Sequence, residues 1–557
     1  MEIQRLKADV LVIGAGGAGM YAALSAAKAG ARQVILLDKN MIGRGGATIM
    51  AQMTVAAALS EAEPDEWEWH LADTLEAGRG LCDPKLAALL CREGPVRMRE
   101  MDEWGVGWAR EGDSIAQVMA PGHGVKRCCY VDFLSTGPAV SQTLRNRVSR
   151  SKEIRRVSNL TITELLINDE RCCGAFGYDV SSGVAVSIEA GATIIATGGL
   201  TKLYARNSAS TNMAGEGYAL ALNAGAELID MEFVQFFPIG HLAPRLVGMD
   251  PIMWDPFRYK LGGLLLNGEH EEFVHRYADA DEGNYKITRD QATFAILSEV
   301  AAGRGSPHGG AYLSFAHLSE DRLREAFGPV IDRLADNGID LTSTAVEVSP
   351  IAHYHMGGIR VNEKMQSTIA GLYAAGEAVG GANGANRLSG NAITEALVFG
   401  DVAGREAALE GANAATAVPS SAEVWAADRL SSMVAASDES PDQQFNRLQG
   451  LMWDSVGPFR DAKGLEFARD QIDGWGVSEE RQGQVTILPF DMNLASRLEL
   501  RAALTSAKAV IASALAREES RGAHQRRDFQ EMNDEAWHCS QRIKLHEGTL
   551  VTDKVRR

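Results

Sequence analysis

The chain has 557 residues, of which 45% are hydrophobic and 23% are charged, an ordinary globular composition with enough length for two to four domains. Its formal net charge of −18 argues against the basic face that a nucleic-acid partner requires. The seven cysteines are odd in number and contain no Cys-x-x-Cys, which argues against a disulfide framework or a bound metal. We expect an acidic cytoplasmic protein with reduced thiols.

A strand–turn–helix–strand unit opens the chain. Residues 9–13 predict a buried strand, residues 20–30 a helix, and residues 33–37 a second buried strand. The glycine-rich turn between the first strand and the helix admits a pyrophosphate to the N-terminus of the helix, and an acidic residue about 20 positions later can bind a ribose hydroxyl. The pattern predicts dinucleotide binding by Gly14, Ala15, Gly16, Gly17, Ala18, Gly19 and Asp38.

The apolar stretch 10–27 is nearly long enough to span a bilayer. It contains four glycines, and Asp9 and Lys28 flank it closely, so a strand, a turn and a helix explain it better. It also lacks the basic segment and cleavage site of a secretion signal. We therefore expect no direct membrane span and no export.

Composition divides the rest of the chain. Residues 191–199 and 371–377 again combine an apolar run with glycines, which predicts that the dinucleotide-binding fold is discontinuous in sequence. Helical periodicity extends from the linker to about residue 521. The predicted order is 1–234 for the first part of the binding domain, 235–348 for an inserted capping domain, 349–410 for the second part, 411–421 for the linker, and 422–557 for a helical domain and tail.

Five ordered segments resemble signatures of the fumarate reductase and succinate dehydrogenase flavoprotein family, which includes L-aspartate oxidase and the adenylylsulfate reductase flavoprotein subunit. The segments are 196–199, 211–217, 231–236, 373–377 and 517–524. The resemblance implies an α/β fold, in which a Rossmann-like FAD-binding domain is interrupted by an α+β capping domain and followed by a helical domain. It also implies FAD contacts by Lys39, Gly46, Thr48, Ala196, Thr197, Gly198, Glu216, Glu377, Asn391, Ala392 and Ile393.

The same resemblance implies three catalytic residues. Arg387 follows Gly-Ala-Asn, and His353 opens His-Tyr-His-Met-Gly-Gly, where the family binds a substrate carboxylate. A planar guanidinium suits that carboxylate. Arg289 resembles the family arginine that donates a proton to the substrate; because arginine is a very weak acid, it needs a strongly basic acceptor such as a carbanion-like α-carbon. The alternative for Arg289 is a salt bridge with Asp290. His355 is equally compatible with a hydrogen-bonded core or pocket residue and with a functional residue.

Two positions depart from the family near the cofactor and the carboxylate. Ala47 stands where succinate dehydrogenases carry the histidine that binds FAD covalently, so we expect non-covalent FAD. Asn383 stands where the family commonly has a histidine before Gly-Ala-Asn-Arg.

The capping segment departs further. In the family, a histidine and a Thr-Glu pair help to bind the second carboxylate of a four-carbon diacid. Here Phe237 replaces the histidine, and the segment around Trp254 matches the Thr-Glu pair only with a shift, so these ligands of the second carboxylate are missing. Burying a second carboxylate without donors is costly. Arg258 or Lys260 could supply a substitute charge, but we favour a substrate with one carboxylate and an apolar or cyclic remainder. The expected pocket residues are Phe237, Trp254, Arg258 and His355.

The resemblance implies a CH–CH oxidoreductase. A hydride would pass between flavin N5 and the β-carbon of a carboxylate substrate, and Arg289 would transfer the α-proton. Two alternatives remain: an amino-acid oxidase of the L-aspartate oxidase type, and a flavoprotein subunit whose electrons pass to an iron–sulfur or other electron-transfer partner.

Overall fold

The computed structural model describes residues 2–132, 135–210, 212–244, 246, 254, 261–277, 289–328, 330–412, 414, 417–433, 440–475 and 487–556. The chain divides into two compact units. The large unit comprises Met1–Ala205, Ala209–Val234 and Tyr354–Arg557, and the inserted unit comprises Arg206–Ser208 and Gln235–His353. The inserted unit thus extends five residues beyond the end of the predicted range 235–348 and also takes in a short segment far upstream.

The large unit contains a mainly parallel sheet. Its central strand β1 (Ile3–Ile13) lies between β2 (Val34–Leu37) and β11 (Ala185–Ile195), both in parallel register. The full order is β8-β2-β1-β11-β10-β9, with β18 (Leu372–Ala374) parallel to β11. The other strands are β8 (Ile154–Val157), β9 (Leu160–Asn168) and β10 (Arg171–Asp179). The central strands β2, β11 and β18 and residues 10–13 of β1 are buried, as expected for parallel strands covered on both faces, and the predicted α/β fold is confirmed.

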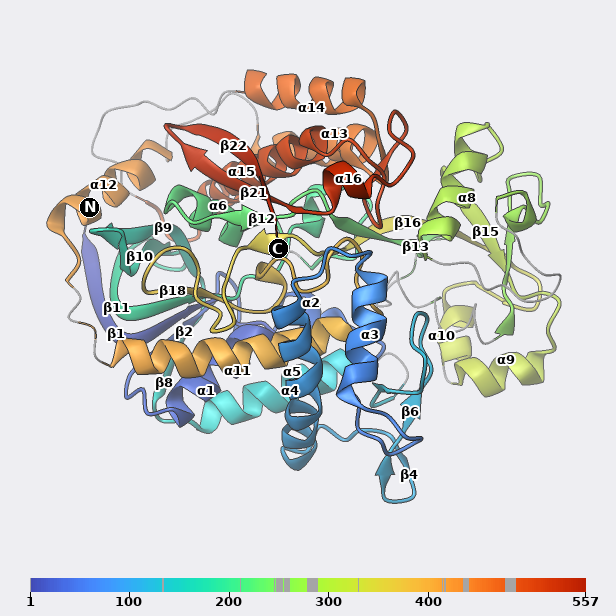
Figure 1. Ribbon diagram of the computed structural model, residues 1–557, viewed down its shortest axis with the longest axis horizontal. Helices are drawn as coiled ribbons and strands as arrows, with labels where there is room; N and C mark the ends of the chain where they lie inside the picture. The colour runs from blue at the N-terminus through green and yellow to red at the C-terminus, as the bar shows by residue number, and fades with distance from the viewer. Residues whose placement is uncertain are drawn as a thin grey trace. The chain divides into compact units, whose positions relative to one another are not determined.

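Two helices of the large unit bring its distant segments together (Figure 1). Helix α1 (Gly17–Lys28) follows the glycine turn, and α11 (Asn391–Gly411) packs closely against it. A side chain at Gly400 or Gly404 of α11 would collide with the backbone of α1. This close approach fixes the start of α11 relative to the glycine turn.

Shorter elements connect these parts of the large unit. The helices are α2 (Ala47–Met50), α3 (Trp67–Ala77), α4 (Pro84–Glu103), α5 (Thr136–Arg150) and α6 (Glu216–Asn223). The strands are β3 (Val55–Ala56), β4 (Arg110–Glu111), β5 (Ser114–Ile115), β6 (Gln117–Val118) and β7 (Cys128–Cys129).

The inserted unit is α+β. Its antiparallel sheet has the order β13-β16-β15-β14. The strands are β13 (Val234–Ala243), β14 (Leu264–Leu266), β15 (Ala311–Ser314) and β16 (Val346–His355), and the helices are α8 (Arg289–Ala301), α9 (Glu320–Phe327) and α10 (Val330–Asp336). Aromatic rings of Trp254, Phe315 and Phe327 pack together in its core. Strands β13 and β16 both cross a unit boundary in the sequence.

The helical prediction for the C-terminal region is confirmed by α12 (Ser420–Met433), α13 (Pro441–Val456), α14 (Ala462–Gly474) and α15 (Met492–Ala516). Helices α11 and α12 extend into both ends of the predicted linker 411–421. The tail, for which no strand was predicted, contains β21 (Ser540–His546) and β22 (Thr549–Val555), which form a hairpin. Strand β21 also pairs with β12 (Leu228–Ile229), which pairs with β17 (Gly358–Ile359). Because β12 needs backbone partners on both edges, the tail completes a sheet of the large unit. The remaining elements are α16 (Asp534–Trp537), β19 (Phe459–Arg460) and β20 (Gln525–Arg526).

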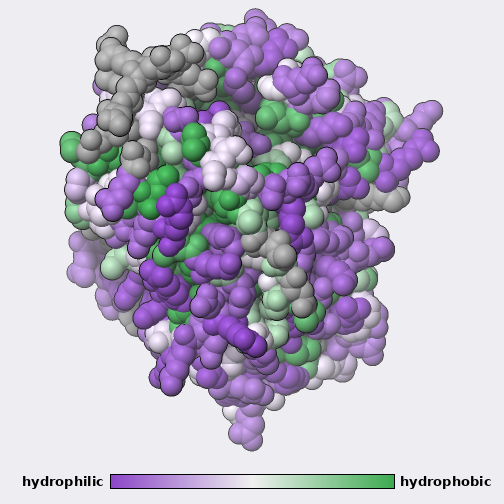
Figure 2. Space-filling view, turned by 90° about the vertical axis from the view of Figure 1, so that its left-hand side faces the viewer, coloured by the Kyte–Doolittle hydropathy of each residue, from purple (hydrophilic) through white to green (hydrophobic). Residues whose placement is uncertain are grey.

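The surface agrees with the composition. The face in Figure 2 is mainly hydrophilic, with separate apolar patches between the polar residues. The seven cysteines are buried thiols. No helix among the described residues is long and apolar enough to cross a bilayer. Within the same part of the chain, no group of three or more His, Cys, Asp or Glu side chains is arranged to hold a metal ion.

Candidate active site

The glycine turn leaves space for an anionic ligand at the start of α1. A side chain at Gly14, whose φ is +99°, would collide with the carbonyl group of Ala196, and one at Gly19 would collide with the carbonyl oxygen of Gly14. By contrast, a Cβ at Gly16 would meet no atom within 4 Å. The first turn of α1 contains no acidic side chain. Its backbone N–H groups and partial positive charge therefore suit a phosphate in this open space.

Asp38 ties the end of β2 to the glycine turn. One carboxylate oxygen accepts from the backbone N–H of Ala15 at 2.9 Å, and the other accepts from that of Asn40 at 2.8 Å. Burial raises the pKa of Asp38, although these N–H groups oppose the shift. Asn212 also donates to Asp38, at 3.4 Å, and accepts from the Asn40 side chain at 2.5 Å. Sequence reasoning missed Asn212, although it lies within the resemblance segment 211–217.

Lys39 is held by carboxylates of the protein itself. Its ammonium group contacts Glu216 and lies 2.9 Å from Glu499 on α15. Burial alone would lower the pKa of Lys39, but the two carboxylates raise it above its usual value. Lys39 and Glu216 therefore join the end of β2 to the start of α6, and Glu499 is a partner that the sequence did not indicate.

The segment 46–48 lies next to the glycine turn at the start of α1. The N–H of Gly46 donates to the hydroxyl of Ser210 at 2.9 Å, and the hydroxyl of Thr48 accepts from the N–H of Gly17 at 3.2 Å. At the end of β11, the buried hydroxyl of Thr197 has no hydrogen-bond partner among the described residues. Such a hydroxyl is available to a polar ligand. Its neighbours Ala196 and Gly198 complete this predicted contact segment.

The start of α11 is the second part of the predicted cofactor site. Helix α11 begins at Asn391, and Ala392 and Ile393 belong to its first turn. The Asn391 amide accepts from Nε2 of His70 at 2.8 Å and donates to the hydroxyl of Thr74 at 3.2 Å. Burial lowers the pKa of His70 to about 3, so its imidazole is neutral. His70 and Thr74 come from α3 and were not predicted, because no local pattern distinguishes them.

Glu377 is a buried carboxyl group. It accepts from the backbone N–H of His355 at 3.0 Å. Burial raises the pKa of Glu377 to about 8, so it is mostly protonated at neutral pH. A protonated carboxyl can donate a hydrogen bond to a ligand oxygen as well as accept one.

Arg387 is buried and stacked on an aromatic ring. Its guanidinium carbon lies 4.4 Å from the centre of the Tyr354 ring, and one of its amino groups donates to the Leu388 carbonyl at 3.1 Å. Glu395 accepts from the Tyr354 hydroxyl and from the Asn383 amide, both at 2.7 Å. Burial raises the pKa of Glu395 to about 7, against the opposing effects of these donors and the charge of Arg387. Asn383, which replaces the family histidine, therefore supports the residues around Arg387.

His353 lies at the end of β16 in the inserted unit. Its Nδ1 is 3.0 Å from the hydroxyl oxygen of Ser208, and its ring centre is 5.7 Å from that of Phe237. Phe237 is buried, with 2% of its surface exposed. The structure thus brings two predicted residues, His353 and Phe237, together within one unit, whereas Arg387 belongs to the large unit. Ser208 was not predicted.

The other predicted pocket residues lie elsewhere. Trp254 is fully buried and donates to His241 at 3.1 Å. His355 is also fully buried, with Nε2 3.0 Å from the Met231 carbonyl oxygen, and burial lowers its pKa to about 4. His355 is therefore a hydrogen-bonded, buried residue of the large unit. Arg258 and the side chain of Arg289 lie outside the described residues, although Arg289 begins α8.

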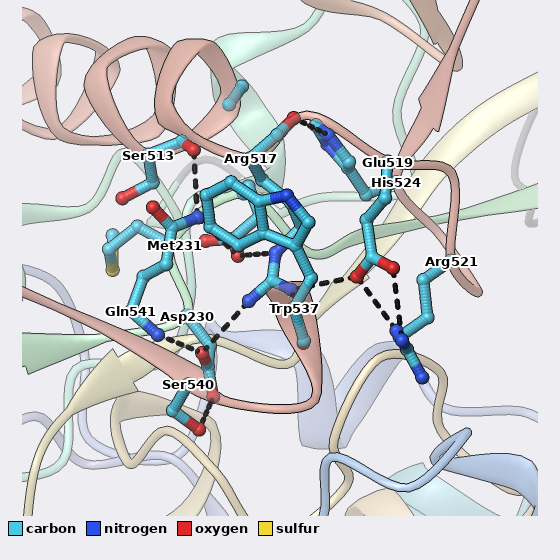
Figure 3. Close-up of polar contacts among 12 residues, drawn as sticks. Asp230, Met231, Ser513, Arg517, Glu519, Arg521, His524, Trp537, Ser540 and Gln541 are labelled. Carbon is cyan, nitrogen blue, oxygen red and sulfur yellow. Dashed lines mark hydrogen bonds and ion pairs between the residues drawn. The ribbon is translucent and has the colours of Figure 1, made fainter. Parts of the chain in front are cut away.

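The last resemblance segment forms a C-terminal ionic cluster of Asp230, Glu232, Arg517, Glu519 and Arg521. Figure 3 shows the Arg517 guanidinium between Asp230 and Glu519. Arg517 lies 2.5 Å from Glu232 and 2.9 Å from Glu519, which also binds Arg521 at 2.8 Å. Asp230 accepts from the Ser540 hydroxyl and the Gln541 N–H, both at 2.9 Å. The cluster therefore fixes residues 230–232, just before the chain passes into the inserted unit.

Known proteins resemble the whole chain. Residues 9–393 match the family model of an FAD-binding domain, and residues 445–554 match that of the fumarate reductase flavoprotein C-terminal region. A subunit of the fumarate reductase (CoM/CoB) of Methanothermobacter marburgensis is 35% identical over 96% of this chain and 97% of its own length. The L-aspartate oxidase of Caulobacter vibrioides is 34% identical over 93% of each chain.

A solved structure agrees with these relatives. Mycobacterium smegmatis Sdh1, in complex with UQ1, has a TM-score of 0.89 and 32% identity, and the match covers 100% of this chain and 95% of that chain. The fold, both family models and the relatives support one assignment. The chain belongs to the fumarate reductase and succinate dehydrogenase flavoprotein family and is an FAD-dependent oxidoreductase.

Proposed function

We propose that this enzyme interconverts a saturated carboxylic acid and its α,β-unsaturated counterpart. The observation that carries the proposal is the buried guanidinium of Arg387, stacked on Tyr354 and four residues before the start of α11. A planar guanidinium can bind a carboxylate through two parallel hydrogen bonds, and burial strengthens their electrostatic attraction. A substrate carboxylate would meet this group next to the helix that we expect to hold the flavin.

The residues present suit FAD. The open space at Gly16 and the buried hydroxyl of Thr197 fit a pyrophosphate and its neighbouring polar groups. Glu377 and the first turn of α11 would hold the flavin end of the cofactor. The chemistry that bound FAD would supply here is hydride exchange with the substrate β-carbon. We propose non-covalent binding, because the methyl group of Ala47 at the start of α2 cannot bond to the cofactor.

Arg387 and His353 hold the substrate carboxylate in this proposal. As the unsaturated acid is reduced, negative charge grows on that carboxylate, and two fixed donors stabilise it. The pKa of Glu395 is about 7. When Glu395 is protonated it carries no negative charge, so it does not compete with the substrate carboxylate for the positive charge of Arg387. Arg289, at the start of α8, transfers the α-proton.

We propose that the substrate has one carboxylate and an apolar remainder. Phe237 packs against His353 in the inserted unit, so an apolar wall borders the carboxylate-binding imidazole. A second carboxylate on that side would lose its hydration without gaining a donor from Phe237.

Flavin reoxidation tests these assignments. The bound flavin is bleached anaerobically with one equivalent of dithionite, and crotonate, cinnamate or fumarate is then added while the flavin absorbance is followed. We expect reoxidation by crotonate or cinnamate, and none by any of the three acids when Arg387 is replaced by Gln. Reoxidation by fumarate alone would refute the single-carboxylate substrate. Failure with all three acids, together with peroxide release on adding amino acids, would refute the reaction in favour of an amino-acid oxidase.

We also propose an electron-transfer partner protein. The relative from Methanothermobacter marburgensis is named as one subunit of a reductase. The seven cysteines of this chain are buried thiols, and no metal-holding group occurs among the described residues, so an iron–sulfur cluster would belong to the partner. Purification from the native source with iron analysis tests this. A stoichiometric iron-containing protein supports the partner, whereas full turnover by the isolated flavoprotein with a soluble electron donor contradicts it.

A further inference from the structure

The short segment Arg206–Ser208 belongs to the inserted unit, although the residues on both sides of it belong to the large unit. The Arg206 guanidinium donates to the carbonyl oxygens of His308 and Gly309, both at 2.8 Å, and contacts the Ser349 hydroxyl. The backbone N–H of Ala352 donates to the Arg206 carbonyl at 2.9 Å. These contacts hold the segment alongside β16, next to His353.

Ser208 is the residue of this segment that meets His353. Its backbone N–H donates to the Ala352 carbonyl at 3.0 Å, which fixes the main chain. Its hydroxyl oxygen lies 3.0 Å from Nδ1 of His353 and 3.5 Å from the Ala352 carbonyl oxygen. A serine hydroxyl both donates and accepts, so it can serve either protonation state of an imidazole.

The two states use the hydroxyl differently. When the imidazole of His353 is neutral, the hydroxyl proton has two acceptors, Nδ1 at 3.0 Å and the Ala352 carbonyl oxygen at 3.5 Å. The shorter bond, to Nδ1, favours the tautomer with the ring proton on Nε2. When the imidazole is charged, Nδ1–H donates to the hydroxyl oxygen, and the hydroxyl proton turns toward the Ala352 carbonyl. In both states Nε2 carries a proton.

We propose that Ser208 is a positioning residue that keeps Nε2 of His353 protonated toward the substrate carboxylate. The inference rests on the proposed function, in which His353 binds that carboxylate. Without the hydroxyl, the neutral ring can carry its proton on Nδ1 and turn a lone pair toward the carboxylate oxygen, which is repulsive. Ser208, Arg206 and His353 all belong to the inserted unit, so this arrangement is internal to one compact unit.

Other titratable groups share this part of the inserted unit. On the elements packed with β16 they are Arg206, His241 on β13, Tyr312 on β15, and Glu347 of β16 with its partner His308. All of them are retained when Ser208 is replaced. A change in pH dependence between wild type and a Ser208 variant therefore reports on the Ser208–His353 pair.

Kinetics provide the first test, with crotonate or cinnamate as the substrate. We expect Ser208→Ala to lower kcat/KM about tenfold on the alkaline side of the pH profile, where the imidazole is neutral. On the acid side, where an imidazolium carries both protons, the loss should disappear. Ser208→Thr should restore wild-type activity. The control Ser343→Ala, also in the inserted unit, removes a hydroxyl bound to Asp340 and should change nothing. A pH-independent loss, or no loss, would overturn the proposal.

Histidine NMR provides a second readout that does not depend on turnover. In protein labelled with ¹⁵N-histidine, with His353→Asn identifying the signal, wild type should show the Nε2–H tautomer at high pH, and Ser208→Ala should show a mixture. An Nδ1–H tautomer in wild type would overturn the proposal. Because this measurement needs no substrate, failure of the proposed reaction and failure of this inference give different results.

Discussion

Replacing Arg517 by Met would remove the central cation of the C-terminal ionic cluster. Arg517 is fully buried, binds Glu232 and Glu519, and donates to the carbonyl oxygens of Trp537 at 3.2 Å and Cys539 at 3.0 Å. Breaking a buried ion pair from one side costs about 3–5 kcal/mol, because the partner charge is left uncompensated. We expect the free energy of unfolding to fall by an amount in this range, since methionine replaces the volume but none of the hydrogen bonds.

Urea unfolding followed by circular dichroism measures this loss. Arg110→Met is the matched control, because Arg110 is 43% exposed and its pair with Asp102 should contribute less than about 1 kcal/mol. Adding Glu232→Gln to Arg517→Met should recover part of the stability, because it removes one of the uncompensated carboxylates. If Arg517→Met lowers the free energy of unfolding no more than Arg110→Met does, the buried charge of Arg517 does not stabilise the cluster, and the argument is refuted.

Three further outcomes follow from the site. Gly14→Ala should abolish bound flavin, measured by absorbance of the folded protein, because the new methyl would collide with the Ala196 carbonyl at a φ of +99°. Arg289→Lys should nearly abolish turnover while flavin content stays normal; preserved turnover would contradict its proton-transfer role. Burial places the pKa of Glu395 at about 7, and its ionised form competes for Arg387, so the Kd for a carboxylate should rise as pH increases through that value. Glu395→Gln should weaken this pH dependence in calorimetric titrations, and the part that is left would come from other groups such as Glu377, whose pKa burial raises to about 8 against the opposing charge of Arg387.

Local sequence patterns predicted the parts of the site that depend on backbone shape. The glycine turn and the strands around it have the expected order, because buried parallel strands and glycine turns leave strong local signals. Asp38 lies at the end of β2, where it binds the turn. The tail hairpin was missed because its pairing with β12 joins residues more than 300 positions apart.

Contacts between distant residues could not be predicted in the same way. Ser208 meets His353 across 145 positions, and His70 meets Asn391 across 321. Nothing near Ser208 or His70 in the sequence indicates these partners. Trp254 is a similar case: nothing in its segment of the sequence indicates that its indole packs with Phe315 and Phe327 in the inserted unit.

The C-terminal ionic cluster also orders the assembly of the chain during synthesis. Asp230 and Glu232 are made almost 300 residues before Arg517, the cation that Glu232 needs once it is buried. Until that later segment leaves the ribosome, burying these carboxylates is unfavourable, so residues 230–232 cannot settle into their final positions. Chains that stop before residue 517 therefore lack a stable anchor at the point where the inserted unit begins.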